Sequence, residues 1–242
     1  MLHGQTALIT GASGGIGSAI ARALAKAGAG LVLHYRADRS TVERLAGELS
    51  APVRIVQADL RSMSAIQTMV AGLKALPLDI VINNAGVWKP TPLGATTEPD
   101  IDEMIELNLR SIFWLMNCLA PQLREGSRIV NISSVAAQTA SASGRSLYRA
   151  TKAAIDSLTR NWALELAPRG IRVNAVAPGM IETGMTAGHL ADDATRQHLL
   201  ARHPLGRFTT ADEVADAVLF LCGEQSRHIT GQIVNVSGGF VV

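Results

Sequence analysis

The sequence predicts an α/β fold in which one parallel, seven-stranded sheet carries helices on both faces. Short apolar runs typical of buried strands alternate with amphipathic segments of helical period, and this alternation predicts right-handed βαβ units. The first apolar run passes directly into a glycine-rich loop and an alanine-rich helix. No linker, internal repeat or low-complexity tract interrupts the chain, so we expect residues 1–242 to form a single domain.

Seven runs rich in aliphatic and β-branched residues are the predicted strands. They cover residues 5–10, 31–35, 53–56, 80–82, 128–132, 171–176 and 233–236. The predicted helices lie near residues 18–27, 39–49, 62–76, 98–124, 146–168 and 210–223. One stretch, about 180–207, fits neither pattern, and an insertion of this length in a compact domain is typical of a substrate flap.

Composition excludes several functional classes. Only 17% of the residues are charged and the net charge is +2, so no nucleic-acid footprint is expected. No apolar run approaches the ~20 residues needed to cross a bilayer, and the first strand begins too early to leave room for a signal peptide. Cys118 and Cys222 lie in apolar stretches without metal-ligand spacing. We therefore expect a cytoplasmic protein with two buried thiols and no metal site.

A glycine-rich loop with Gly11, Ser13, Gly15, Ile16 and Gly17 joins the first strand to the first helix. Unpaired N–H groups and the positive end of the helix dipole point at the same spot there, which favours a bound anion. Glycines let the backbone approach a pyrophosphate and let the helix pack close to the strand. A lone glycine loop is often only a turn, but the flanking strand and helix favour a cofactor site.

Tyr148 and Lys152 are four residues apart in a predicted helix, so they share one helix face. A positive charge ~4 Å from the phenol at an effective dielectric of ~20 favours the phenolate by ~4 kcal/mol, or roughly three pKa units. Burial of the phenol acts in the opposite direction. The pair predicts a tyrosine whose pKa is brought toward the range useful for general acid–base catalysis.

Seven sequence elements occur in the order found in the short-chain dehydrogenase/reductase family, which the chain resembles over nearly its whole length. These elements are residues 10–17, Asp59, residues 83–86, Asn108, Ser134, Tyr148 with Lys152, and residues 178–183. The resemblance implies a Rossmann-like sheet of strand order 3-2-1-4-5-6-7, with a nicotinamide cofactor across the carboxyl ends of the strands. It also implies an NAD(P)-dependent enzyme acting on CH–OH groups.

The family's catalytic roles carry over to four residues. Tyr148 would exchange a proton with the substrate oxygen, and Lys152 would hold the nicotinamide ribose and lower the pKa of the phenol. Ser134 would hydrogen-bond the substrate oxygen, although Ser133 or a simple helix cap remain alternatives at this point. Asn108 would bind a water that links Lys152 to solvent, and the alternative is a core asparagine with its hydrogen bonds satisfied.

The resemblance also implies a set of cofactor-binding residues at the strand ends. Asp59 would accept a hydrogen bond from the adenine amino group, or would instead cap a helix. Ile181 and Thr183 would contact the nicotinamide carboxamide. The full set is Gly11, Ser13, Gly15, Ile16, Gly17, Arg36, Asp59, Leu60, Asn84, Ala85, Gly86, Tyr148, Lys152, Pro178, Gly179, Ile181 and Thr183.

The end of the second strand bears on the choice of cofactor. A carboxylate there would bind the ribose 2′-hydroxyl of NAD, but no acid occurs before Asp38. Arg36 or Arg39, with the hydroxyls at 40–41, could hold a 2′-phosphate. Gly14 argues the other way, because NADP-preferring relatives often carry Arg or Lys at this position. We expect NADP(H) to be favoured over NAD(H).

Three functions remain open at this point. The overall pattern is similar to that of 3-oxoacyl-carrier-protein reductases, which favours a reductase of a ketone or 3-oxoacyl group. An alcohol or sugar dehydrogenase is the second possibility, and a cofactor-binding sensor or scaffold without turnover is the third. Lys89, Arg145 and Arg149 offer only a thin basic surface for a carrier protein. The three histidines of the flap, at 189, 198 and 203, are expected to be solvated.

Assembly is predicted from the two longest helical segments. Residues 98–124 and 146–168 carry apolar side chains on more than one face, including those of Phe113 and Trp162. A helix that is apolar all round is buried on both sides. The family resemblance implies a homotetramer built from such helices.

Overall fold

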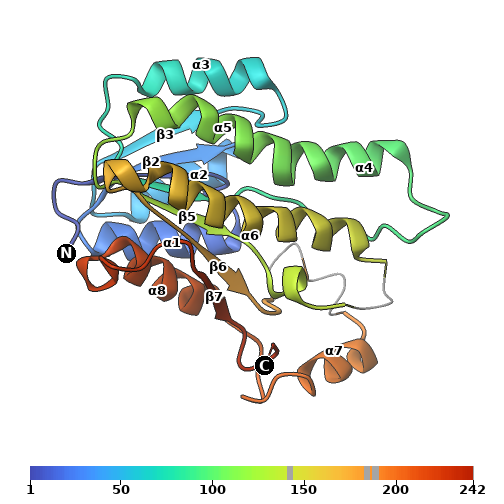
Figure 1. The fold of residues 1–242 in the computed structure, drawn as a ribbon. Coiled ribbons are helices and arrows are strands. Elements are labelled where there is room, and N and C mark those ends of the chain that lie inside the picture. Colours follow the sequence, from blue (N-terminus) through green and yellow to red (C-terminus); the bar gives the residue numbers. More distant parts are fainter. Residues whose placement is uncertain (141–143, 183–185, 187–190, 242) are drawn as a thin grey trace.

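The computed structural model describes residues 1–140, 144–182, 186 and 191–241 (Figure 1). It confirms the predicted fold class, because seven parallel strands form one sheet in the order β3-β2-β1-β4-β5-β6-β7. The strands are β1 (Thr6–Ile9), β2 (Gly30–Tyr35), β3 (Val53–Gln57), β4 (Ile80–Asn83), β5 (Arg128–Ile132), β6 (Arg172–Pro178) and β7 (Ile233–Val236). The direction of winding reverses between β1 and β4, so a crevice opens at the carboxyl ends of these strands.

Helices cover both faces of the sheet. They are α1 (Gly15–Lys26), α2 (Arg39–Glu48), α3 (Met63–Leu73), α4 (Glu98–Ile105), α5 (Ser111–Leu119), α6 (Ser146–Leu166), α7 (Asp193–Leu200) and α8 (Ala211–Cys222). Figure 1 shows α1 beside α8 on one side of the sheet and α3, α5 and α6 along the other. Alternate residues of β1 point to opposite sides, so Ile9 packs in the core beneath α1 and α8 while Leu8 packs under α3 and α5.

The segment predicted as one helix over 98–124 is broken into pieces. A π-helical turn, Glu106–Arg110, separates α4 from α5, and a 3₁₀ turn, Ala120–Gln122, follows α5. A π turn accommodates one extra residue and so shifts the apolar pattern, but in a segment that is apolar on more than one face this shift is not visible in the sequence. Its consequence is local, because Asn108 lies within it and is completely buried.

The predicted flap contains regular structure of its own. Ile181 forms a parallel bridge with Thr209, and α7 begins at an Asp192 cap whose carboxylate accepts a hydrogen bond from Thr195 N at 2.8 Å. The remaining 3₁₀ turns are Val135–Gln138, Ala167–Arg169 and Glu224–Ser226. Across the part of the chain that the structure describes, no helix is both long and apolar enough to span a membrane.

Candidate active site

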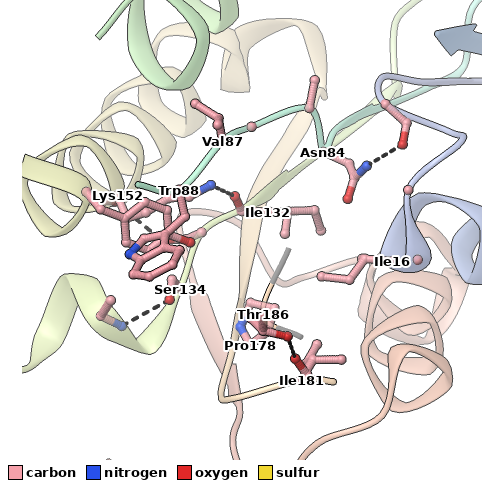
Figure 2. A pocket seen from close by; sticks show the side chains of 18 of the residues that line it. Ile16, Asn84, Val87, Trp88, Ile132, Ser134, Lys152, Pro178, Ile181 and Thr186 are labelled. Carbon is pink, nitrogen blue, oxygen red and sulfur yellow. Dashed lines mark hydrogen bonds between the residues drawn. The ribbon is translucent and has the colours of Figure 1, made fainter. Parts of the chain in front are cut away.

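A cavity of about 640 Å³ lies at the carboxyl ends of the central strands (Figure 2). Its wall runs from the glycine-rich loop after β1 and Arg36 after β2 to Ser134 after β5 and Tyr148 on α6. Because β2 and β5 are three strand spacings apart, these two ends are separated by about 14 Å. The cavity is therefore long enough for an extended dinucleotide, with an arginine at one end and hydroxyl groups at the other.

The glycine-rich loop is shaped for close approach of a ligand to the backbone. Gly11 has φ +65°, and a Cβ at Gly17 would come within 2.3 Å of the Gly11 carbonyl oxygen. The N-cap of α1 is Gly14, which makes no side-chain cap hydrogen bond, and the first turn holds no acidic residue. The N–H groups of this turn are therefore available to an anion, which fits a cofactor pyrophosphate.

Asn84 fixes the loop from the neighbouring strand. Its side-chain amide donates to the carbonyl oxygens of Thr10 at 2.8 Å and Gly11 at 3.0 Å. Figure 2 shows the Asn84 amide donating a hydrogen bond at the edge of the cavity. Asn84, Ala85 and Gly86 all line the cavity, so this segment both supports the loop and forms part of the wall.

His34 is a site residue that sequence reasoning missed. It is 2% exposed, its Nδ1 accepts a hydrogen bond from Gly11 N at 3.1 Å, and its Nε2 bonds the Ala58 carbonyl oxygen at 3.0 Å. These two partners require a neutral ring protonated on Nε2, and burial lowers the pKa of the imidazole in agreement. The signal in the sequence was a single polar residue inside an apolar strand.

The structure separates the two arginines considered for a 2′-phosphate. Arg36 lines the cavity, whereas Arg39 donates to Glu43 at 2.8 Å on the exposed face of α2. The hydroxyls at 40–41 both donate to the carboxylate of Asp38, which caps α2. Of the groups proposed from sequence, Arg36 is the one that faces the cavity.

Asp59 has a partner within the protein. Its carboxylate is held by Arg61, with 2.6 Å between Arg61 Nη2 and Asp59 Oδ2, and this hydrogen bond lowers the pKa of the carboxyl to about 2. Leu60 lines the cavity, but Asp59 lies outside its lining. The cap alternative was wrong, because the N-cap of α3 is Ser62, and the adenine contact of Asp59 stays a prediction.

Tyr148, Ser134 and Lys152 meet at the other end of the cavity. The Ser134 hydroxyl lies beside the Tyr148 phenol, close enough to act on its pKa. The Lys152 ammonium donates to the Ile132 carbonyl oxygen at 2.8 Å and lies 5.8 Å from the centroid of the Tyr148 ring (Figure 2). All three line the cavity, so a carbonyl oxygen near the two hydroxyls would also lie near an ammonium group.

Burial dominates the protonation equilibria of this pair. It raises the pKa of the Tyr148 phenol, and the neighbouring Ser134 hydroxyl and the charge of Arg145 act against it. Burial also lowers the pKa of the Lys152 ammonium to about 8, opposed by Asp156. The sequence-based expectation was a phenol whose pKa is lowered by Lys152. The structure differs, because desolvation of the phenolate outweighs the favourable charges.

The choice between the two serines follows from their partners. Ser133 is buried, and its hydroxyl donates to Asp156 Oδ1 at 2.5 Å and to the Lys152 carbonyl oxygen at 3.3 Å. Ser134 reaches Tyr148 and also accepts a hydrogen bond from Ala136 N at 3.1 Å. Ser134 therefore lies beside the phenol and caps the following 3₁₀ turn as well.

Asn108 has its side chain satisfied by protein groups. Its Oδ1 accepts from Val87 N at 2.8 Å, and its Nδ2 donates to the Val87 carbonyl oxygen at 2.8 Å and to Thr151 Oγ1 at 3.3 Å. A Cβ at Gly86 would lie 3.2 Å from Asn108 Oδ1 and 3.7 Å from Lys152 Nζ. Asn108 thus ties the loop after β4 to α6, which is the alternative kept open from sequence.

The remaining predicted residues lie after β6. Pro178, Gly179 and Ile181 line the cavity, and Thr183 lies outside the described residues. Thr186, which also lines it, donates a hydrogen bond to the Ile181 carbonyl oxygen (Figure 2).

Two further residues, just after α7, lie where the sequence did not predict them. Arg202 lines the cavity and lies 4.4 Å from the Phe240 ring centroid, although sequence reasoning did not single it out. His203 was expected to be solvated, which was wrong. It is 3% exposed, with the rings of Phe208 and Phe240 centred 5.2 and 4.9 Å away.

Comparisons with known proteins agree with this geometry. A family model described as Enoyl-(Acyl carrier protein) reductase matches residues 11–241. The 3-oxoacyl-[acyl-carrier-protein] reductase FabG of Thermotoga maritima is 36% identical, covering 100% of this chain and 99% of that protein. A short-chain dehydrogenase/reductase from Serratia marcescens superposes with a TM-score of 0.93 at 33% identity, over 100% of this chain and 99% of the other. A blue fluorescent protein from a metagenomic library, solved in complex with NADPH, superposes with a TM-score of 0.94 at 33% identity, over 100% of this chain and 99% of the other.

Proposed function

The chain belongs to the short-chain dehydrogenase/reductase family of oxidoreductases, and we propose that it reduces a ketone or 3-oxoacyl group with NADPH. The observation that carries this proposal is the convergence of the Tyr148 and Ser134 hydroxyls at the cavity wall, with Lys152 one helix turn away. Two hydroxyls that converge in this way can both donate to a substrate carbonyl oxygen.

Tyr148 acts as the general acid in this scheme. Because burial raises the pKa of its phenol, the side chain is protonated at neutral pH, and a proton donor is what carbonyl reduction requires. Ser134 orients the substrate oxygen toward the phenol. The raised pKa favours reduction over the alternative of an alcohol or sugar dehydrogenase, since oxidation would need the phenolate as base.

Lys152 stabilises the negative charge that appears on Tyr148 as its proton leaves. Its ammonium, with a pKa of about 8, carries most of its charge at pH 7 and is held in place by the Ile132 carbonyl oxygen. A bound nicotinamide supplies the hydride. Lys152 also holds the nicotinamide ribose, and Asn108 keeps the wall behind it rigid through its bonds to Val87 and Thr151.

The cofactor lies along the strand ends in the proposed complex. The loop at 11–17 holds the pyrophosphate, Leu60 and residues 84–86 contact the adenosine, and residues 178–183 hold the nicotinamide. Arg36 binds a 2′-phosphate at the far end, which supports NADP(H) over NAD(H). The structural relative solved with NADPH supports the same preference.

A substrate panel tests the proposal. Ethyl acetoacetate and a 3-oxoacyl thioester are offered with NADPH and with NADH, and secondary alcohols and sugars are offered with the oxidised cofactors, following nicotinamide absorbance. We expect turnover of the carbonyl compounds with NADPH. Turnover confined to alcohols or sugars would contradict the proposal. Cofactor binding without any turnover would support a sensor or scaffold instead.

We also propose a cytoplasmic homotetramer. The exposed apolar side chains of Phe113 (50% exposed) and Leu164 (77%), on α5 and α6, suit an interface between copies of this chain. Cys118 and Cys222 are both free thiols, which suits a reducing compartment, but only Cys222 is buried as expected and Cys118 is partly exposed.

A further inference from the structure

Three arginines, Arg145, Arg149 and Arg202, line the cavity beside the proposed proton donor. We propose that the carbonyl substrate carries a carboxylate or phosphate a few bonds from its carbonyl carbon, and that these three guanidiniums bind it. This inference rests on the reductase function proposed above and names the substrate class of the same site.

Helix geometry brings two of these arginines next to the reacting group. Arg145 is the N-cap of α6, and Tyr148, Arg149 and Lys152 follow it at i+3, i+4 and i+7, so all four lie on the same side of the start of this helix. Arg149 N donates to the Arg145 carbonyl oxygen at 3.0 Å, which closes the first turn. Side chains at this spacing begin about 5–6 Å apart, so an anion held here lies within a few bonds of a carbonyl at Tyr148.

Arg149 and Arg145 are held in place by the surrounding protein. Arg149 Nη1 donates to the Ala136 carbonyl oxygen at 3.1 Å and to Thr139 Oγ1 at 2.6 Å, and also to the Thr139 carbonyl oxygen. Its Nε is buried and has no hydrogen-bond partner among the described residues. The guanidinium of Arg145 lies 5.7 Å from the Trp88 ring centroid. Side chains fixed in this way lose little conformational entropy when a ligand binds.

The three positive charges act on one another. After burial, the charges of Arg149 and Arg202 are the next causes that lower the pKa of Arg145, and Arg202 does the same to Arg149. Bringing like charges together is unfavourable, and a bound anion relieves that repulsion. Lys89 is different, because Asp100 at 3.0 Å and Glu103 at 2.6 Å already neutralise it.

The cofactor's own phosphates belong elsewhere in the cavity. A 2′-phosphate at Arg36 would lie three strand spacings from Ser134, about 14 Å, and a pyrophosphate at the β1 loop would lie two spacings away, about 10 Å. The phosphate of a carrier-protein prosthetic group is separated from the thioester carbonyl by many bonds. The anion that this cluster fits is therefore part of a short oxo acid or a phosphorylated ketone.

Two matched pairs of substrates test the inference with the full-length enzyme. Acetoacetate is compared with ethyl acetoacetate, and dihydroxyacetone phosphate with dihydroxyacetone, using NADPH throughout. We expect kcat/KM to be at least about tenfold higher for the charged member of at least one pair. Arg145→Gln and Arg202→Gln should lower that ratio about tenfold or more, mainly through KM. Arg227→Gln removes one exposed positive charge away from the cavity and should leave the ratio unchanged.

Equal use of charged and neutral members in both pairs, or an unchanged ratio in both variants, would overturn the inference while leaving the reductase function intact. Binding separates the two proposals further. Calorimetry with 3-hydroxybutyrate, added to the enzyme loaded with NADP⁺, should show binding that Arg145→Gln weakens about tenfold. Such binding without any carbonyl turnover would support the anion site and contradict the reductase function. Absence of binding, together with equal use of charged and neutral substrates, would contradict the anion site.

Discussion

The Lys152 ammonium lies 5.8 Å from the centre of the Tyr148 ring, one turn further along the same helix. Lys152 is buried and Tyr148 is partly buried, and desolvation moves the equilibria of both groups toward the neutral forms. The phenol is therefore protonated before the reaction, and the ammonium is close enough to stabilise the phenolate after the proton has been donated. The site therefore holds a protonated group that can donate to a carbonyl during its reduction. The burial of the pair should affect both the stability of the fold and the rate of turnover.

Replacing Lys152 by Met should stabilise the fold at neutral pH while abolishing turnover. The pKa of Lys152 falls from 10.5 to about 8 on folding, so its buried charge costs about 3 kcal/mol below pH 8. Between pH 8 and 10.5 the unfolded chain binds more protons, so the unfolding free energy of the wild type rises through this window. The difference in unfolding free energy between Lys152→Met and the wild type should therefore become smaller between pH 8 and 10.5.

Denaturant unfolding at pH 7, 9 and 10.5 measures this effect. Lys74→Met, at an exposed position, is the matched control and should show no such pH dependence. A Lys152→Met enzyme that is less stable than the wild type by the same amount at every pH would contradict the assigned burial cost.

Arg36→Ala should change cofactor preference. A charge-assisted hydrogen bond to a 2′-phosphate contributes about 1.5–3 kcal/mol, so kcat/KM with NADPH should fall roughly 10- to 150-fold while the value with NADH changes little. Arg39→Ala is the control, because Arg39 is paired with Glu43. This variant should leave the ratio of kcat/KM with NADPH to kcat/KM with NADH unchanged. A wild-type enzyme that prefers NADH would contradict the proposal that Arg36 binds a 2′-phosphate.

His34 should make the protein sensitive to acid. Its pKa is lowered from 6.5 by burial, so below pH 6.5 the unfolded chain binds more protons and the unfolding free energy falls as pH decreases. Protonation of Nδ1 would also break the bond from Gly11 N and loosen the loop. We expect His34→Asn to flatten the pH dependence of stability between pH 5 and 6.5, whereas His198→Asn, at an exposed position, should not. Identical slopes in wild type and His34→Asn would refute this role.

Assembly is tested by sedimentation. The wild type should sediment as a tetramer, and Phe113→Glu or Leu164→Glu should yield smaller species, because each places a charge on an exposed apolar face. Leu93→Glu, at a loop residue that is 95% exposed, is the control and should leave the mass unchanged. A wild-type monomer would show that these side chains cover no interface.

Sequence patterns located the strands closely because a sheet covered on both faces leaves long apolar runs. The strands β5 and β7 begin and end as predicted, and β1 is shorter than its predicted run at both ends. The π turn around Asn108 was not predictable, because an apolar pattern over 98–124 does not reveal one inserted residue. The family resemblance, rather than periodicity, supplied the strand order.

Side-chain roles were harder to predict where they depend on distant partners. The bonds of His34 to Gly11 and Ala58 join residues more than 20 positions apart, and only the strand order brings them together. The same holds for Ser133, whose partner Asp156 is on α6. The raised pKa of Tyr148 depends on burial, which local spacing does not report.

The most direct test of the central claim is Tyr148→Phe, compared with the wild type for NADPH affinity and for turnover of a carbonyl substrate. The phenol is proposed to donate the proton, so kcat should fall about 10²- to 10⁴-fold while the Kd for NADPH stays within twofold. A variant that binds NADPH normally and keeps a kcat within a few-fold of the wild type would show that Tyr148 is not the proton donor.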